Sequence, residues 1–222
     1  MGHEVLPHHE AFSGLGTFAL MLLVSSILSI RLRGILKPSS LPRTVSLWLF
    51  VDGIIRTYDG LFGVLRPASM SWKIYEPYKT YCGADRTYCD LGNGWMWTES
   101  YMDLWEVSLG TIALWMASTP PVSFPKRAPQ LLALVATTMC FHKTCMYLLM
   151  EPMTDYAATG HNDWVGFWLI WFLPNFIWVV MPGVCMCILS RDLLAVAEQQ
   201  PTAEAPPVER DVDRKTRRGK RA

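Results

Sequence analysis

Five apolar stretches separated by polar connections dominate the pattern of this chain of 222 residues. They cover residues 12–30, 44–65, 101–118, 129–150 and 164–189. A helix rises about 1.5 Å per residue, so each stretch is long enough to cross roughly 30 Å of hydrocarbon. The pattern therefore predicts an all-α fold, an integral membrane bundle of five transmembrane helices.

The two ends of the chain differ in character. No basic segment precedes the first apolar stretch and no small-residue cleavage site follows it, so we expect it to be kept as a span and not cleaved as a signal peptide. Residues 1–197 then form one transmembrane domain. Residues 198–222 are rich in proline and charge, and too poor in apolar side chains to order themselves. We expect a disordered cytoplasmic tail there.

Lysine and arginine lie mainly on one side of the predicted bundle. They occupy the 31–43 connection, the 119–128 connection and the tail, whereas the 151–163 connection has none. Cytoplasmic loops carry an excess of these residues. The distribution predicts a lumenal or external N-terminus and a cytoplasmic C-terminus.

Composition and motifs exclude several classes of function. Charged residues make up only 18% of the chain, the net charge is +1, and no basic stripe indicates a nucleic-acid partner. A glycine-rich phosphate loop, a nucleophile elbow and a zinc-protease motif are absent from the sequence, so we predict no cofactor and no metal. Cys82 and Cys89 lie in one connection, and their spacing alone leaves a disulfide open.

Ionisable residues lie inside the second and third stretches. Asp52, Arg56 and Asp59 are spaced four and three apart, which places them on one helix face. Asp103 and Glu106 share a face for the same reason. One hypothesis is an ion-pair set that joins the two helices. The other is a desolvated carboxyl that holds a proton and delivers it to an alkene.

The fourth stretch carries His142 and Lys143 near its middle. A lysine at that depth costs several kcal/mol unless it pairs or loses its charge. Lys143 shares a helix face with Tyr147, four residues later. His142 is either a hydrogen-bonded packing residue or, with Lys143, a replacement acid or base lining a cavity.

Several motifs in the last two stretches occur in a familiar order. They are Tyr147-Leu148-Leu149-Met150-Glu151, Gly160-His161, Phe167-Trp168 and the run from Asn175 to Gly183. This order resembles the emopamil-binding protein family of sterol isomerases, which belongs to the wider EXPERA group of lipid proteins. The resemblance implies a five-helix bundle in the endoplasmic reticulum membrane.

The resemblance also implies roles for single residues. Asp59, followed by glycine, stands where the family has Glu-Gly, and Glu106 looks like the acid of the third span. Asn175 and Trp178 match the family's pair in the fifth span. Ile55 stands where the family has histidine, which puts the sterol reaction itself in doubt. Trp178 is either a packing residue or an aromatic wall beside a developing carbocation.

The expected function is a cofactor-independent membrane isomerase or cyclase. Its substrate would be an apolar sterol, terpenoid or polyketide, and the lipid bilayer its surroundings; a homodimer stays open. The alternative is a non-catalytic sterol- or lipid-binding or trafficking protein on the same scaffold. The candidate catalytic residues are Asp59, Glu106, His142 and Lys143, and the candidate substrate-binding residues are Asp52, Arg56, Asp103, Tyr147, Asn175 and Trp178.

Overall fold

A computed structural model of the protein describes residues 8–90, 92, 94–119 and 125–199. All regular structure in those residues is helical, which confirms the all-α prediction for this part of the chain. The long helices are α1 (His8–Leu36), α2 (Arg43–Val64), α4 (Gly94–Ser118), α5 (Ala128–Met153) and α6 (Leu173–Gln199). The shorter elements are η1 (Ala68–Ser71), η2 (Lys73–Tyr75), α3 (Glu76–Tyr81), η3 (Arg86–Tyr88) and the π-helical η4 (Gly166–Phe172), which leads into α6.

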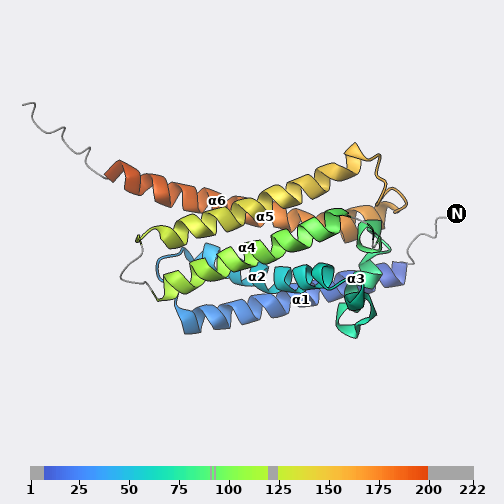
Figure 1. Ribbon diagram of the computed structural model, residues 1–222, viewed down its shortest axis with the longest axis horizontal. Coiled ribbons are helices and arrows are strands. Elements are labelled where there is room, and N and C mark those ends of the chain that lie inside the picture. The colour runs from blue at the N-terminus through green and yellow to red at the C-terminus, as the bar shows by residue number, and fades with distance from the viewer. Residues whose placement is uncertain (1–7, 91, 93, 120–124, 200–222) are drawn as a thin grey trace, which may run out of the picture.

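The five long helices run side by side along the long axis of the molecule, up and down in turn (Figure 1). Each packs on its neighbour in the sequence, and the α2–α4 contact is the most extensive. The connection between α2 and α4 and the connection between α5 and α6 lie at the same end (Figure 1). Functional residues that lie far apart in the sequence are thereby brought to shared levels of the bundle.

Three segments are long and apolar enough to cross a membrane. They are Gly16–Leu36, Ala128–Met153 and Gly166–Ala195. Large aliphatic side chains such as Leu20, Ile27 and Ile30 are about half exposed on α1, as expected of a helix that faces lipid. These observations indicate a membrane protein.

The helices extend beyond the predicted spans. The first runs from His8 to Leu36 and ends two residues before Pro38, which cannot continue a helix. The last continues to Gln199, ten residues past the predicted end of the span and two past the predicted domain boundary at 197. Residues 200–222, the rest of the predicted tail, lie outside the described residues.

Two glycines of α2 allow it to approach α4 closely. A Cβ atom built on Gly63 would lie 1.6 Å from Oγ of Ser100. One on Gly60 would lie 3.0 Å from the side chain of Leu104. The absence of side chains at these two positions brings the helix backbones together and fixes which carboxyl groups of α2 and α4 face each other.

Gly63→Ala is therefore expected to destabilise the protein by about 1–3 kcal/mol through overpacking. Gly53→Ala is the matched control, because a Cβ at Gly53 meets nothing within 4 Å and alanine favours the helix. Thermal unfolding in detergent should show a lower Tm for Gly63→Ala and an unchanged or higher Tm for Gly53→Ala. Equal Tm values for the two variants would contradict the close approach.

Residues 66–90 fold into a cap over one end of the bundle. A disulfide joins Cys82 to Cys89, which answers the question that their spacing leaves open. The cap is held against the α5–α6 connection by side chains of His161 and Asn162, which contact the carbonyl oxygens of Gly83 and Ala84 at 2.7 Å. The cap therefore tethers α2 and α4 to the end of α5 and the start of α6.

Asp85 is the buried anchor of this cap. Its carboxylate accepts hydrogen bonds from the Thr87 backbone N–H at 2.8 Å, from Trp171 Nε1 at 3.2 Å and from the Tyr147 hydroxyl. Burial raises the pKa of Asp85 to about 6, and the nearby Glu151 carboxyl also raises it against the opposing effect of these hydrogen bonds. Asp85 thus binds its proton more tightly in the folded protein than in the unfolded chain.

This pKa predicts a pH dependence of stability. The stabilisation due to Asp85 is present in full below about pH 4, and it is lost as the pH rises to about 6 and above. The loss amounts to roughly 2–3 kcal/mol, at 1.36 kcal/mol per pKa unit. Melting curves between pH 4 and 8 should show a steeper fall of Tm for the parent than for Asp85→Asn, which cannot titrate. Parallel curves would rule out this role for Asp85.

Candidate functional site

Seven ionisable side chains meet between α2, α4 and α5, midway along the bundle. We call them the charge cluster. None of them is more than 7% exposed. The members are Asp52, Arg56 and Asp59 from α2, Glu99, Asp103 and Glu106 from α4, and Lys143 from α5.

The two cations of the cluster bridge the three helices. Lys143 Nζ contacts the Asp103 carboxylate and lies 3.1 Å from Glu106 Oε2. Arg56 lies 3.2 Å from Asp59, 3.5 Å from Asp103 and 3.7 Å from Asp52. Asp103 is thus shared by both cations. The geometry matches the predicted ion-pair set between the second and third stretches and extends it to the fourth.

The cluster is not balanced in charge. Five carboxyl groups face two cations, so full ionisation would leave three negative charges uncompensated among the described residues. An uncompensated charge in apolar surroundings costs several kcal/mol. Some of these carboxyls must therefore carry protons unless a ligand brings positive charge. The ion-pair hypothesis and the proton-holding hypothesis thus apply to different members of one cluster.

Asp52 has a distinct environment within the cluster. Trp178 Nε1 donates a hydrogen bond to its Oδ1 at 2.8 Å, and a carboxyl oxygen of Glu106 lies within 4.8 Å of a carboxyl oxygen of Asp52. The Cys140 thiol lies 3.7 Å from the same Oδ1. Ligand atoms of Asp52, Glu106 and Cys140 lie within 4.8 Å of one another, close enough to hold a metal ion. Arg56 and Lys143 contact the same carboxylates, however, and their charges oppose a metal cation there.

Trp178 lies against the charge cluster, one helical turn before a proline. Pro182 has no N–H, so the carbonyl oxygen of Trp178 lacks its usual helical partner. The Cys140 sulfur lies 4.0 Å from this oxygen and partly replaces that partner. α6 stays continuous through Pro182, and the irregular turn of this span is η4, which ends just before Pro174.

The cation that lies over the Trp178 ring is a side chain of the protein itself. The Arg56 guanidinium carbon is 5.2 Å from the ring centroid. Phe18 and Trp48 pack around the same ring with centroids at 5.8 Å. Trp178 therefore packs in the core, and its cation–π partner in the structure is Arg56. Its role beside a developing carbocation stays a prediction.

Three of the predicted site residues lie away from the charge cluster. His142 is exposed on the outer face of α5, although Lys143 beside it is buried. The Tyr147 hydroxyl is bonded to Asp85 of the cap, and Trp171 Nε1 donates to it at 2.9 Å. The Asn175 amide donates to the hydroxyl of Tyr81 in the cap at 2.9 Å. These polar groups of Tyr147 and Asn175 serve to hold the cap.

Two members of the site are missing from the sequence-based set. Glu99 is buried, and one of its carboxyl oxygens has no hydrogen-bond partner in the described part of the chain. Its position one turn before Asp103 is visible in the sequence, but Glu99 is not among the predicted site residues. Cys140, three before Lys143, shares that residue's helix face and could have been found in the same way.

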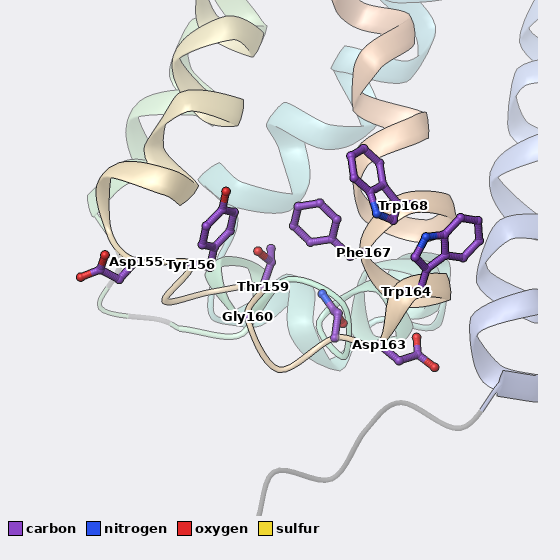
Figure 2. A pocket seen from close by; sticks show the side chains of 9 residues that line it. Asp155, Tyr156, Thr159, Gly160, Asp163, Trp164, Phe167 and Trp168 are labelled. Atoms are coloured by element: carbon purple, nitrogen blue, oxygen red, sulfur yellow. The ribbon is translucent and has the colours of Figure 1, made fainter.

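A separate groove opens at the capped end of the bundle (Figure 2). It has a volume of about 660 Å³, and none of the predicted site residues lines it. Tyr156 and Phe167 stand on either side of Thr159, with Trp164 and Trp168 on the η4 side (Figure 2). Aromatic residues at a helix end are typical of the membrane–water interface. The charge cluster, and not this groove, therefore carries the candidate chemistry.

Comparison with known proteins adds no relative. No protein-family model matches the chain, and no curated protein matches it either. The function is therefore argued from the charge cluster.

Proposed function

We propose that the protein is a cofactor-independent membrane isomerase or cyclase that acts on an apolar alkene by protonation and deprotonation. The observation that carries the proposal is the excess of buried carboxyl groups over cations in the charge cluster. Protonating an alkene needs an acid that is shielded from water and close to groups that stabilise a cation. The cluster offers both, and the resemblance to the emopamil-binding protein family supports the same chemistry.

The proposal includes a five-span topology in the endoplasmic reticulum membrane. α2 and α4 are 22 and 25 residues long, which corresponds to about 33 and 37 Å of helix. Apart from Arg43 at the first position of α2, their charged residues are buried inside the bundle, as charges in a span must be. Arg33 in the last turn of α1 and Lys126 just before α5 lie at one end of the bundle and the cap lies at the other, which supports a cytoplasmic basic end and a lumenal cap.

The reaction follows from the chemistry of the carboxyl groups. A protonated carboxyl breaks its O–H bond and forms a C–H bond at one alkene carbon, which leaves a carbocation at the other. Loss of a proton from an adjacent carbon to a carboxylate forms the shifted double bond. In a cyclisation, a second double bond of the substrate attacks the cation before the proton is lost. Glu106 is the proposed acid, and Asp59, paired with Arg56, stabilises the cation.

A non-catalytic lipid- or sterol-binding protein is the second candidate. The observation that favours it is the Trp178 ring, whose cation–π partner is already Arg56. A binding protein needs this packing and one or two polar contacts to its ligand, and no transferable proton. It would bind the same class of apolar molecule without converting it.

The two candidates are separated by product analysis. The purified protein would be incubated with sterol, terpenoid and polyketide alkenes, and the extracts searched for isomers of unchanged mass. The proposal predicts a rearranged or cyclised product from at least one class, formed by the parent and not by Glu106→Gln. Saturable binding of a substrate that is recovered unchanged would support the binding protein instead.

A further inference from the structure

We infer that Asp52 and Glu106 share one proton and together form the acid of the reaction. This inference rests on the proposed function and deepens it. It gives a catalytic role to Asp52, which has a carboxyl oxygen within 4.8 Å of a carboxyl oxygen of Glu106.

The short distance between the two buried carboxyl groups calls for a proton. An ionised carboxylate has only hydrogen-bond acceptors, so two of them in contact repel each other unless one carries a hydrogen. Oε1 of Glu106 is buried and has no hydrogen-bond partner among the protein groups described. A proton held between the two carboxyl groups removes the repulsion and also supplies a donor.

The cations of the cluster are committed mainly to other carboxyls. Arg56 makes its shorter contacts with Asp59 at 3.2 Å and Asp103 at 3.5 Å, and its contact with Asp52 is the longest at 3.7 Å. Lys143 is bonded to Asp103 and Glu106. Asp52 therefore receives the least compensation of the carboxyls that contact a cation, and this favours a proton shared between Asp52 and Glu106.

The geometry also holds the pair in place. The indole N–H of Trp178 donates to Asp52 Oδ1 at 2.8 Å and fixes the orientation of that carboxyl. Glu106 is held by Lys143 at 3.1 Å. Glu99 is a further carboxyl that lacks a cation among the described residues. The acidic residue nearest to it in the sequence is Asp103, which is not a member of the pair. Within the described cluster, only Asp52 and Glu106 combine two carboxyl groups within 4.8 Å, an indole donor and a neighbouring ammonium.

The pair can give up its proton and recover it. When the O–H bond breaks and the C–H bond forms, both carboxyls are ionised for the lifetime of the carbocation. Lys143 and Arg56 lie within 4 Å of the pair and stabilise this state. The proton lost from the adjacent substrate carbon then returns to the pair. The proton count is unchanged over the cycle, and no co-reactant is needed.

Infrared spectroscopy of the purified protein tests the shared proton without a substrate. The carbonyl stretch of a protonated carboxyl shifts when the protein is exchanged into deuterated water, and the measurement is made at pH 8, where Asp85 is ionised. Asp52→Asn and Glu106→Gln should each remove the same band. After either substitution the remaining carboxyl lies beside a cation and no second carboxyl shares its proton, so it is ionised. Asp59→Asn is the matched control and should retain the band, since Asp59 is paired with Arg56.

Turnover gives the second readout. Asp52→Asn should lower it on the order of 10²-fold, and the double variant should be no slower than the slower single one, as expected for residues that act as one unit. Asp52→Asn with the band and turnover of the parent would overturn the inference. A tightly bound divalent metal that either substitution releases would also overturn it.

The inference and the proposed function can fail separately. A band lost in both variants, from a parent that converts no alkene, would uphold the shared proton and defeat the proposed enzyme. If Asp52→Asn does not fold, the parent protein labelled with isotopic aspartate is measured instead. The label should shift a protonated-carboxyl band. An unshifted spectrum would contradict the shared proton.

Discussion

Glu106→Gln should lower turnover on the order of 10²-fold or more while ligand affinity changes by a few fold at most. The amide keeps the shape of the side chain and can still accept a hydrogen bond from Lys143, 3.1 Å away. It cannot hold or transfer the proton. Asp59→Asn should also lose turnover, because it removes the charge paired with Arg56 that is proposed to stabilise the cation.

Steady-state kinetics and equilibrium binding on the same preparations measure the two effects separately. Ser108→Ala is a suitable control, since Ser108 is exposed on the outer face of α4 and bonds only its own helix, at the Leu104 carbonyl. Its kinetics should equal those of the parent. Parent turnover in both Glu106→Gln and Asp59→Asn would show that the acid–base roles assigned here are wrong.

Lys143→Met should have the largest effect on stability. The substitution removes the ammonium between Asp103 and Glu106 and leaves Arg56 as the one cation of the described cluster. Removing one partner from a buried ion pair costs about 3–5 kcal/mol, part of which the carboxyls recover by binding protons. We expect a protein that folds at low temperature, with a clearly lower Tm in detergent and impaired turnover.

His142→Gln is the matched control for this variant. His142 precedes Lys143 in the sequence, but it is exposed on the outer face of α5. Its substitution should leave Tm within the range of ordinary surface changes, about 0.5 kcal/mol. A Lys143→Met protein with the Tm and turnover of the parent would mean that the two ion pairs of Lys143 contribute neither to stability nor to activity.

Much of this arrangement follows from the sequence because it depends on local spacing. Helical periodicity placed Asp52, Arg56 and Asp59 on one face and Asp103 and Glu106 on another, and the structure brings those faces together. The length and hydropathy of the stretches were sufficient for the all-α class. These features depend on the helical repeat of 3.6 residues and on the free-energy cost of exposing a charge to lipid. Both apply to any sequence, so the type and spacing of the residues are enough to predict them.

The contacts between helices could not be predicted in the same way. Glu106 faces Asp52 because of the register of α2 on α4, and that register depends on the contact between Gly63 and Ser100. Adjacent residues on a helix point about 100° apart, so spacing alone could not show whether His142 or Lys143 is buried.

The cap explains the remaining differences from the sequence-based site. Tyr147 meets Asp85, which is 62 residues away, and Asn175 meets Tyr81, which is 94 residues away. Neither contact leaves a local pattern. Both polar groups looked available for a substrate because the segment that binds them folds back from a distant part of the chain.

Turnover in deuterated water tests the central claim, proton transfer by the charge cluster, most directly. Once a substrate is found, the purified protein is incubated with it in deuterated water and the product is analysed by mass spectrometry. Protons on the carboxyls exchange with solvent between turnovers, so the product should carry one deuterium at the carbon that was protonated. Rearranged product free of solvent deuterium, formed over many turnovers, would contradict proton donation by this cluster.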